Sequence, residues 1–250
     1  MHERPRKTLL YIANEDWAFV QHRLPMARAA QAAGFDVHVA THVSQHAAAI
    51  AAEGFTLHAI PFQRGNRSPA ATIATIKAIR TIERKISPHL IHHSGLQCCV
   101  LGGLASIDMR IPKVFALTGL GYIFTGNSAQ ARSLRLIVSG VLRFLLNRKN
   151  SITLVQNPDD QRALERAGID ASRIELIPGS GVDTDKLLPL SEPEGPVTIG
   201  FAGRLLTEKG IRALVAAHRI LRGRGTDVNL LIAGEPDPAN PASVTVEEAR

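Results

Sequence analysis

The fold is decided by residues 8–40, which read TLLYIANEDWAFVQHRLPMARAAQAAGFDVHVA. The apolar run at residues 8–12 predicts a strand, and the Ala-rich segment from Leu24 to Ala33 predicts a helix that ends at Gly34. Residues 36–40 predict a second strand. A strand, a helix and a strand in succession form a right-handed parallel crossover. This unit therefore predicts an α/β protein with a doubly wound sheet.

The same alternation continues along the chain and then restarts after a proline-rich joint. Further strands are expected at residues 56–60, 90–93, 113–117 and 152–156, with helices at 47–53, 68–86 and 96–106. Two strands and one helix follow the joint, at residues 197–202, 210–222 and 228–233, and they cannot cover both faces of a sheet. We therefore expect a Rossmann-like N-terminal domain (residues 1–188), a linker (189–196) and an incomplete second Rossmann-like domain (197–250).

Composition excludes several classes of protein. An apolar share of 45% is too high for a disordered chain, and 250 residues can bury a full core without disulfides. The two cysteines, Cys98 and Cys99, are adjacent, so neither a disulfide framework nor a CxxC metal site is expected. No apolar run approaches the ~20 residues of a membrane span, and no signal peptide is recognisable.

Basic residues are concentrated in the middle of the chain. Between residues 60 and 150, thirteen Lys and Arg residues are opposed only by Glu83 and Asp108. Such a stretch either forms solvated helix faces or is attracted to an anionic membrane or phosphate-bearing lipid. Nucleic acid is disfavoured, because Tyr and Trp total three and no nucleic-acid-binding motif is present.

The segment from Ala131 to Lys149 has helical periodicity. Its apolar stripe consists of Leu134, Ile137, Val141 and Leu145, with arginines on the other faces. A basic amphipathic helix of this kind can lie in a lipid interface, and it can equally pack on its own sheet.

Glycine-rich stretches at 119–124 and 179–184 lack the third glycine of a dinucleotide-binding fingerprint, and no P-loop motif exists. The informative block is FAGRLLTEKGI at residues 201–211, which lies where a parallel strand ends and a helix begins. Gly203 with Arg204 and Lys209 suits a diphosphate, which the helix dipole would also favour. The plainer alternative is a basic loop in which the cations pair with Glu208.

The block GRLLTEKG resembles the donor-phosphate motif of family 4 glycosyltransferases, which have the two-Rossmann GT-B fold. Further stretches, in the same order along the whole chain, resemble the branch that builds O-antigen and other glycans on polyprenyl diphosphates. They are HRLP (22–25), IHHSG (91–95), LTGLGYIFTG (117–126), QNPDD (156–160), IPGSGVD (177–183) and AGEPDPANPAS (233–243).

The resemblance implies a retaining transfer of a sugar from a nucleotide-diphosphate sugar, a UDP-sugar above all, to a lipid-linked acceptor. Arg204 and Lys209 would neutralise the diphosphate leaving group, and Gly203 would permit its close approach. With two cations in that role we expect no metal and no further cofactor. Asp159 and Asp160, the tempting carboxylate pair, are better explained as the first turn of a helix.

The first domain is expected to hold the acceptor. Its candidate acceptor-side residues follow the predicted strands, and they are His22, Arg23, Thr118, Gly119 and Gly121. A solvent-exposed helix start and a plain turn are the alternatives for them. Glu15 and Asp16 are available as a general base, although nothing in the sequence selects either.

The resemblance also implies a histidine in the cleft that contacts the donor sugar, and His92 and His93 are the catalytic candidates. Because alternate residues of a strand face opposite ways, only one of them should point to the cleft. An ungapped reading of the motif puts Ser94 in that place instead, and a structural role is the alternative for both histidines.

One departure from the family pattern concerns the end of the chain. The family carries a late pair of glutamates, seven residues apart, that grips the donor, and this chain ends before it; Glu247 and Glu248 are adjacent and precede that region. We therefore predict a C-terminally truncated enzyme with little or no activity as this polypeptide. We expect it in the cytoplasm, bound to the inner face of the membrane. The alternatives are a non-catalytic acceptor-binding half of a split transferase and a GT-B nucleotide-sugar epimerase.

Overall fold

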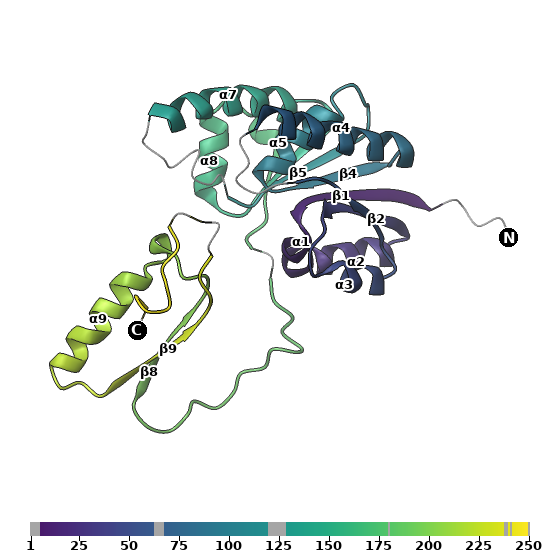
Figure 1. Ribbon diagram of the computed structural model, residues 1–250. Coiled ribbons are helices and arrows are strands. Elements are labelled where there is room, and N and C mark those ends of the chain that lie inside the picture. Colours follow the sequence, from purple (N-terminus) through teal and green to yellow (C-terminus); the bar gives the residue numbers. More distant parts are fainter. Residues whose placement is uncertain are drawn as a thin grey trace. The chain divides into compact units, whose positions relative to one another are not determined.

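A computed structural model of the chain describes residues 6–62, 68–119, 129–179, 181–237, 240 and 242–249, with residues 129–134 described by their backbone alone. The chain divides into two compact units, Met1–Val182 and Asp183–Arg250. Each unit is an α/β structure, and Figure 1 shows both.

Unit 1 is built on a seven-stranded sheet whose order is β3-β2-β1-β4-β5-β6-β7. All neighbouring strands run parallel. The order reverses between β1 and β4, as it does in doubly wound nucleotide-binding folds. The predicted α/β class is confirmed. The strands are β1 (Lys7–Glu15), β2 (Phe35–His42), β3 (Thr56–Ala59), β4 (Leu90–Ser94), β5 (Lys113–Leu117), β6 (Ser151–Val155) and β7 (Ile174–Leu176).

Helices cover both faces of this sheet (Figure 1). One face packs against α1 (Asp16–His22), α2 (Leu24–Ala32) and α3 (Ala47–Ala52), through a core that includes Tyr11 and Phe19. The other face packs against α4 (Pro69–Ile86), α5 (Leu96–Ala105), α7 (Ala129–Leu146) and α8 (Pro158–Arg166). A 3₁₀ turn, η1 (Ala171–Arg173), precedes β7. Because both faces are covered, the strands can be apolar throughout their length.

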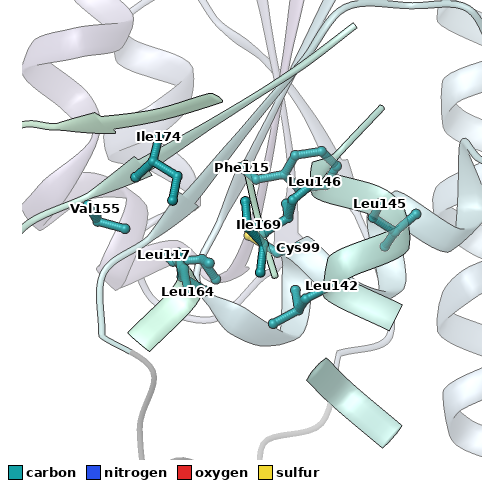
Figure 2. Packing of buried hydrophobic residues seen from close by; sticks show 10 residues of the cluster. All are labelled: Cys99, Phe115, Leu117, Leu142, Leu145, Leu146, Val155, Leu164, Ile169 and Ile174. Carbon is teal, nitrogen blue, oxygen red and sulfur yellow. The ribbon is translucent and has the colours of Figure 1, made fainter. Parts of the chain in front are cut away.

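Figure 2 shows the core beneath α5, α7 and α8, where ten buried side chains from six helices and strands and one connection meet. Phe115 and Leu117 of β5 contact this cluster from the sheet, while Leu142, Leu145 and Leu146 enter it from α7. Their burial, at ~25 cal/mol per Å² of apolar surface, holds α7 on the sheet.

The amphipathic stripe predicted on α7 does not form one uniform face. Leu145 is buried and Val141 partly buried, whereas the side chain of Ile137 is 65% exposed; the side chain of Leu134 lies outside the described residues. The expectation of a single stripe is therefore corrected, because α7 carries two apolar faces. One of them packs on the sheet, and the other leaves Leu136, Ile137 and Phe144 exposed.

Unit 2 begins with residues 183–196, which carry neither helix nor strand and are exposed. Two parallel strands follow, β8 (Val197–Ala202) and β9 (Val228–Ala233), connected through the 3₁₀ turn η2 (Thr207–Lys209) and the helix α9 (Ile211–Gly223). Their core consists of Leu205, Ile211, Val215, Val244 and Ala249. This is one β-α-β unit, a connection that is right-handed in nearly all proteins.

Sequence patterns missed two short elements of unit 1. Helix α1 is seven residues long and buries only Asp16 and Phe19, so it shows no full helical period. Strand β7 has three residues, below the length at which alternation is recognisable. Both are fixed by contacts with their neighbours rather than by local pattern.

Candidate functional site

Polar side chains gather at the carboxyl edge of the unit 1 sheet, around the point where the strand order reverses. Two adjoining cavities of about 350 Å³ and about 130 Å³ open there, and they share His22, Arg23, Thr118 and Gln156 in their linings. Ligands of open parallel sheets bind at this position. The larger cavity is also lined by Asn14, Ala18, Ser94 and Gly95, and the smaller by Pro25, Met26, Ala116, Leu154, Val155, Ile177 and Gly179.

Arg23 is the central charged group of this edge. It lies between α1 and α2, where it ends the first helix and begins the second. The residue is only 5% exposed, and Nε of its side chain donates a hydrogen bond to Oγ of Ser94 at 2.8 Å. Burial lowers the pKa of the guanidinium from its usual range. Among the described residues it forms no ion pair with a carboxylate.

Three of the five acceptor-side candidates meet in these cavities, namely His22, Arg23 and Thr118. Gly119 follows Thr118 directly but does not line either cavity, and Gly121 lies outside the described residues. The role of all five in acceptor binding stays a prediction.

Two residues of this edge, Asn14 and Gln156, were not among the site residues predicted from the sequence. Asn14 is the second-last residue of β1, and Gln156 directly follows β6. A polar residue where a buried parallel strand ends was the signal that could have found both. With Thr118 after β5, they supply amide and hydroxyl groups that can hydrogen-bond a polar ligand.

The two histidines of β4 lie inside the unit, on opposite sides of the sheet. His92 is 3% exposed and its ring lies 4.9 Å from that of Tyr11, while His93 is fully buried and stacks on Phe115 at 4.8 Å. A Cβ on Gly102 of α5 would lie only 2.4 Å from Nδ1 of His93, so the helix packs directly on that ring. Neither histidine lines the two cavities.

Burial lowers the pKa of both His92 and His93 to about 3, which keeps the rings neutral at physiological pH. Nε2 of His92 and both ring nitrogens of His93 have no hydrogen-bond partner among the described residues. Neither ring lines the cavities of unit 1, whereas Ser94, the fourth residue of the IHHSG motif, lines the larger one. Alternate residues of β4 face opposite sides of the sheet, and helices cover both sides, so both rings are buried. The catalytic role of His92 and His93 stays a prediction.

The acidic residues at the end of β1 are engaged elsewhere. Asp16 is fully buried and accepts hydrogen bonds from the backbone of Trp17, Ser44 and His46 and from the Ser44 hydroxyl. Burial would raise its pKa, but these hydrogen bonds hold it below the usual range. Asp16 therefore fixes the loop after β2, and Glu15 contacts His42 at 3.1 Å.

Unit 2 places its predicted diphosphate-binding residues in the loop between β8 and α9. Nη1 of Arg204 pairs with Oδ2 of Asp237 at 2.6 Å, and the Arg204 side chain is 46% exposed. The alternative pairing of Arg204 with Glu208 does not occur. Lys209 is exposed at the end of η2 and pairs with none of the described residues.

A close backbone contact between Gly203 and Gly234 fixes the position of the loop. A Cβ on Gly234, directly after β9, would lie 1.8 Å from the carbonyl oxygen of Gly203. Leu205 and Leu206 are buried, and their backbones bond to residues 235 and 204. The loop therefore presents Arg204 and Lys209 from a fixed backbone at the carboxyl edge of its sheet.

Neither a metal-binding cluster nor a membrane-spanning helix is found among the described residues. The part of the chain that the structure describes contains no group of three or more His, Cys, Asp or Glu side chains that could hold a metal ion. None of the described helices is both long and apolar enough to cross a bilayer.

The fold and the cavity at its switch point define the class of open α/β sheets that bind their ligands at the carboxyl edge. Residues 8–157 match the model of the glycosyl transferase 4-like family, and the chain belongs to that family. This confirms the family indicated by the motifs. A comparison with curated proteins gives no match.

Solved structures share the fold. A sucrose-phosphate synthase from Thermosynechococcus elongatus superposes with a TM-score of 0.73 at 20% identity, over 98% of this chain and 66% of that one. HepE from Anabaena, in complex with UDP and glucose, gives 0.62 at 14% identity over 94% and 70%. A putative UDP-N-acetylglucosamine 2-epimerase from Listeria monocytogenes gives 0.60 at 15% identity over 98% and 66%. The chain thus spans about two thirds of the length of these proteins, and at such identities the likeness concerns the fold.

Proposed function

We propose that this chain carries the acceptor-binding domain and part of the donor-binding domain of a retaining glycosyltransferase. The donor is a nucleotide-diphosphate sugar, most simply a UDP-sugar, and the acceptor is a glycan on a polyprenyl diphosphate. Membership of the glycosyl transferase 4-like family supports the reaction class. HepE, a neighbour in fold, is described in complex with UDP and glucose, which supports the choice of nucleotide.

The observation that carries the proposal is the fixed loop of unit 2. Gly203 leaves room for a diphosphate to approach the backbone closely, and Arg204 follows it in the loop. Lys209 has no partner among the described residues. Two cations stabilise the negative charge that develops on a diphosphate leaving group, and removal of such a group costs a few kcal/mol of barrier. Lys209 is the sharper probe, since Arg204 already has Asp237 as a partner.

The test is titration of the chain with UDP and with GDP by calorimetry. Lys209→Met should weaken UDP binding by roughly tenfold or more, because a charge-assisted bond to phosphate is lost. The matched control is Lys186→Met, a lysine of unit 2 that is 77% exposed and paired with Asp183. Equal, tight UDP binding by wild type and Lys209→Met would remove Lys209 from this role.

We further propose that the chain binds the cytoplasmic face of a membrane, and a surface on α7 supports this. Leu136, Ile137 and Phe144 are 77%, 65% and 55% exposed, and the guanidinium of Arg148 lies 5.6 Å from the centre of the Phe144 ring. Exposed Arg143 and Lys149 add positive charge near them. Apolar side chains flanked by cations match an anionic lipid interface, and we place the cytoplasmic membrane contact here.

Sedimentation with vesicles tests this surface and separates the transferase from the epimerase alternative. We expect the chain to sediment with phosphatidylglycerol vesicles and not with phosphatidylcholine vesicles, and the double substitution Ile137→Ser, Phe144→Ser to stay in the supernatant. Ile220→Ser on α9, where the side chain is 54% exposed, is the control. A wild-type chain that remains in the supernatant with both vesicles would favour a reaction without a lipid acceptor.

A further inference from the structure

Arg23 is a buried cation, and no carboxylate among the described residues forms an ion pair with it. It is 5% exposed, and its hydrogen bond with the described residues is the one from Nε to the Ser94 hydroxyl. Because the hydroxyl is neutral, this hydrogen bond does not compensate the positive charge of the guanidinium. A charge removed from water without a partner is costly, and proteins retain it mainly where a ligand completes the site.

The titratable groups around Arg23 do not supply a countercharge. Burial raises the pKa of Tyr11 to about 12 and lowers that of His92 to about 3, so both are neutral at physiological pH. Burial also raises the pKa of Cys99. The acids at the start of α1 are bound elsewhere, Glu15 to His42 and Asp16 to the loop after β2.

The backbone adds positive potential to the same cavity. Arg23 and Pro25 stand at the amino end of the nine-residue helix α2, and Gly95 at that of the ten-residue helix α5. Neither helix has an acidic residue in its first turn. Amino ends of helices favour anions, because their first N–H groups are unpaired and the helix dipole is positive there.

We propose that the cavity of unit 1 binds a phosphoryl group, in the form of a diphosphate, through the guanidinium Nη groups of Arg23 with the Ser94 hydroxyl holding its Nε. The inference rests on the proposed function for the source of that diphosphate, which is the lipid-linked acceptor. Asn14, Thr118 and Gln156 line the cavity and offer hydrogen bonds to the remaining oxygens or to the first sugar.

The size of the cavity fits this ligand. At about 350 Å³ it lies at the lower end of the range of about 300–1,000 Å³ for small-molecule sites. It can enclose a charged head group but not a prenyl chain, which would remain outside the cavity.

The first experiment measures inorganic pyrophosphate binding to the full chain by calorimetry and by the shift of the thermal midpoint. Arg23→Met should weaken binding by roughly tenfold to a hundredfold, since the main charge-assisted bonds are lost. The unliganded Arg23→Met chain should unfold at the same temperature as wild type or higher, because a buried unpaired charge has been removed. The control is Arg28→Met, an arginine of the same helix that is half exposed and paired with Glu53.

A second experiment identifies the source of the diphosphate. Farnesyl diphosphate and UDP are each titrated into wild type, Arg23→Met and Lys209→Met. If the acceptor is the source, farnesyl diphosphate binding depends on Arg23 and UDP binding on Lys209. If UDP binding depends on Arg23 and farnesyl diphosphate competes with it, the diphosphate site stands but its ligand is the nucleotide.

The two proposals fail separately. Arg23-dependent pyrophosphate binding without any Lys209-dependent UDP binding keeps the site and removes the proposed donor. Pyrophosphate binding that is absent in wild type, or equal in wild type and Arg23→Met, overturns the site. If Arg23→Met does not fold, Arg23→Lys decides, because it keeps the charge but not the planar fork; an unchanged affinity then overturns the proposal.

Discussion

Arg23 and Arg204 follow the first strand of their respective units, yet their surroundings are opposite. Arg23 is 5% exposed and bonds to a neutral hydroxyl, whereas the side chain of Arg204 is 46% exposed and pairs with the carboxylate of Asp237. The side chain of Arg23 is fixed by the residues that bury it, whereas Arg204 is positioned by a loop whose backbone is in close contact with Gly234.

The difference shows how each unit can present a cation to an anionic ligand. In unit 1 the charge is desolvated in advance, so a ligand gains the full interaction but the empty protein is destabilised. In unit 2 the charge stays hydrated and balanced, so the empty protein gains or loses little and a ligand has to compete with Asp237. Substitutions and pH should therefore act differently on the two units.

Among the single substitutions, the largest effect is expected from Gly234→Ala. The added Cβ would collide with the carbonyl oxygen of Gly203 at 1.8 Å, and because that atom is backbone, the whole loop has to shift. We expect unit 2 to lose about 3 kcal/mol of stability and the chain to lose UDP binding. Hydrogen exchange of β8 and β9 measures the stability. Gly200→Ala in β8, where a Cβ meets nothing within 4 Å, is the control, and equal exchange in both variants would contradict the anchoring role.

The next effect is a pH dependence that is largest in unit 1, since the buried titratable side chains of the described residues all lie there. The pKa of His92 and His93 is lowered to about 3, so the unfolded state binds more protons below pH 6.5 and stability falls as the pH drops from there towards 3. Each histidine contributes about 1.4 kcal/mol per pH unit in that range.

Glu83 acts in the opposite direction. Burial raises its pKa to about 8, so the folded state holds a proton that the unfolded state has lost, and stability falls as the pH rises from about 4.5 to 8. The two histidines outweigh Glu83 below pH 6.5, which predicts maximal stability of unit 1 near that pH. Urea unfolding followed by the fluorescence of Trp17, the one tryptophan of the chain, measures this. Glu83→Gln should remove the decline above pH 6.5, whereas the exposed Glu175→Gln should not.

Ser94→Ala sharpens the comparison at Arg23 itself. Loss of the Oγ acceptor leaves the buried Nε without a partner, which should cost about 1–3 kcal/mol of the free energy of unfolding. Thermal or urea unfolding of the unliganded chain measures it. Ser87→Ala, at the exposed end of α4, is the comparison. A loss below that of Ser87→Ala would mean that Arg23 is solvated in the folded protein.

The smallest effect on stability is expected from Arg204→Met. An ion pair with a half-exposed partner contributes less than about 1 kcal/mol, so the unfolding of unit 2 should barely change while UDP binding falls. Hydrogen exchange and UDP calorimetry together check this. A large loss of stability would show that Arg204 supports the loop rather than the ligand.

Much of the fold followed from local patterns. The strands at residues 113–117, 197–202 and 228–233 and the helix that begins at Pro69 lie where they were predicted. Each has a clear apolar period or a cap that marks its start. Helix α1 and strand β7 were missed, because short elements stabilised by neighbours carry no period of their own.

The candidate site was only partly predictable. The resemblance to family motifs indicated His22, Arg23 and Thr118, which line the unit 1 cavities, and also Arg204 and Lys209, which lie on the unit 2 loop. It also selected His92 and His93, whose side chains the sheet buries. Strand alternation says that neighbours face opposite ways, but not that helices cover both faces at that point.

The sequence by itself determined the α/β class, the family and the basic character of the middle of the chain, because periodicity, motif order and charge are properties of residues in succession. Only the tertiary structure decided which polar groups are buried, which carboxylates are already engaged, and that Arg23 pairs with none of the described carboxylates. Burial and pairing depend on residues far apart in the chain, such as Arg23 and Ser94, and sequence spacing holds no record of those distances.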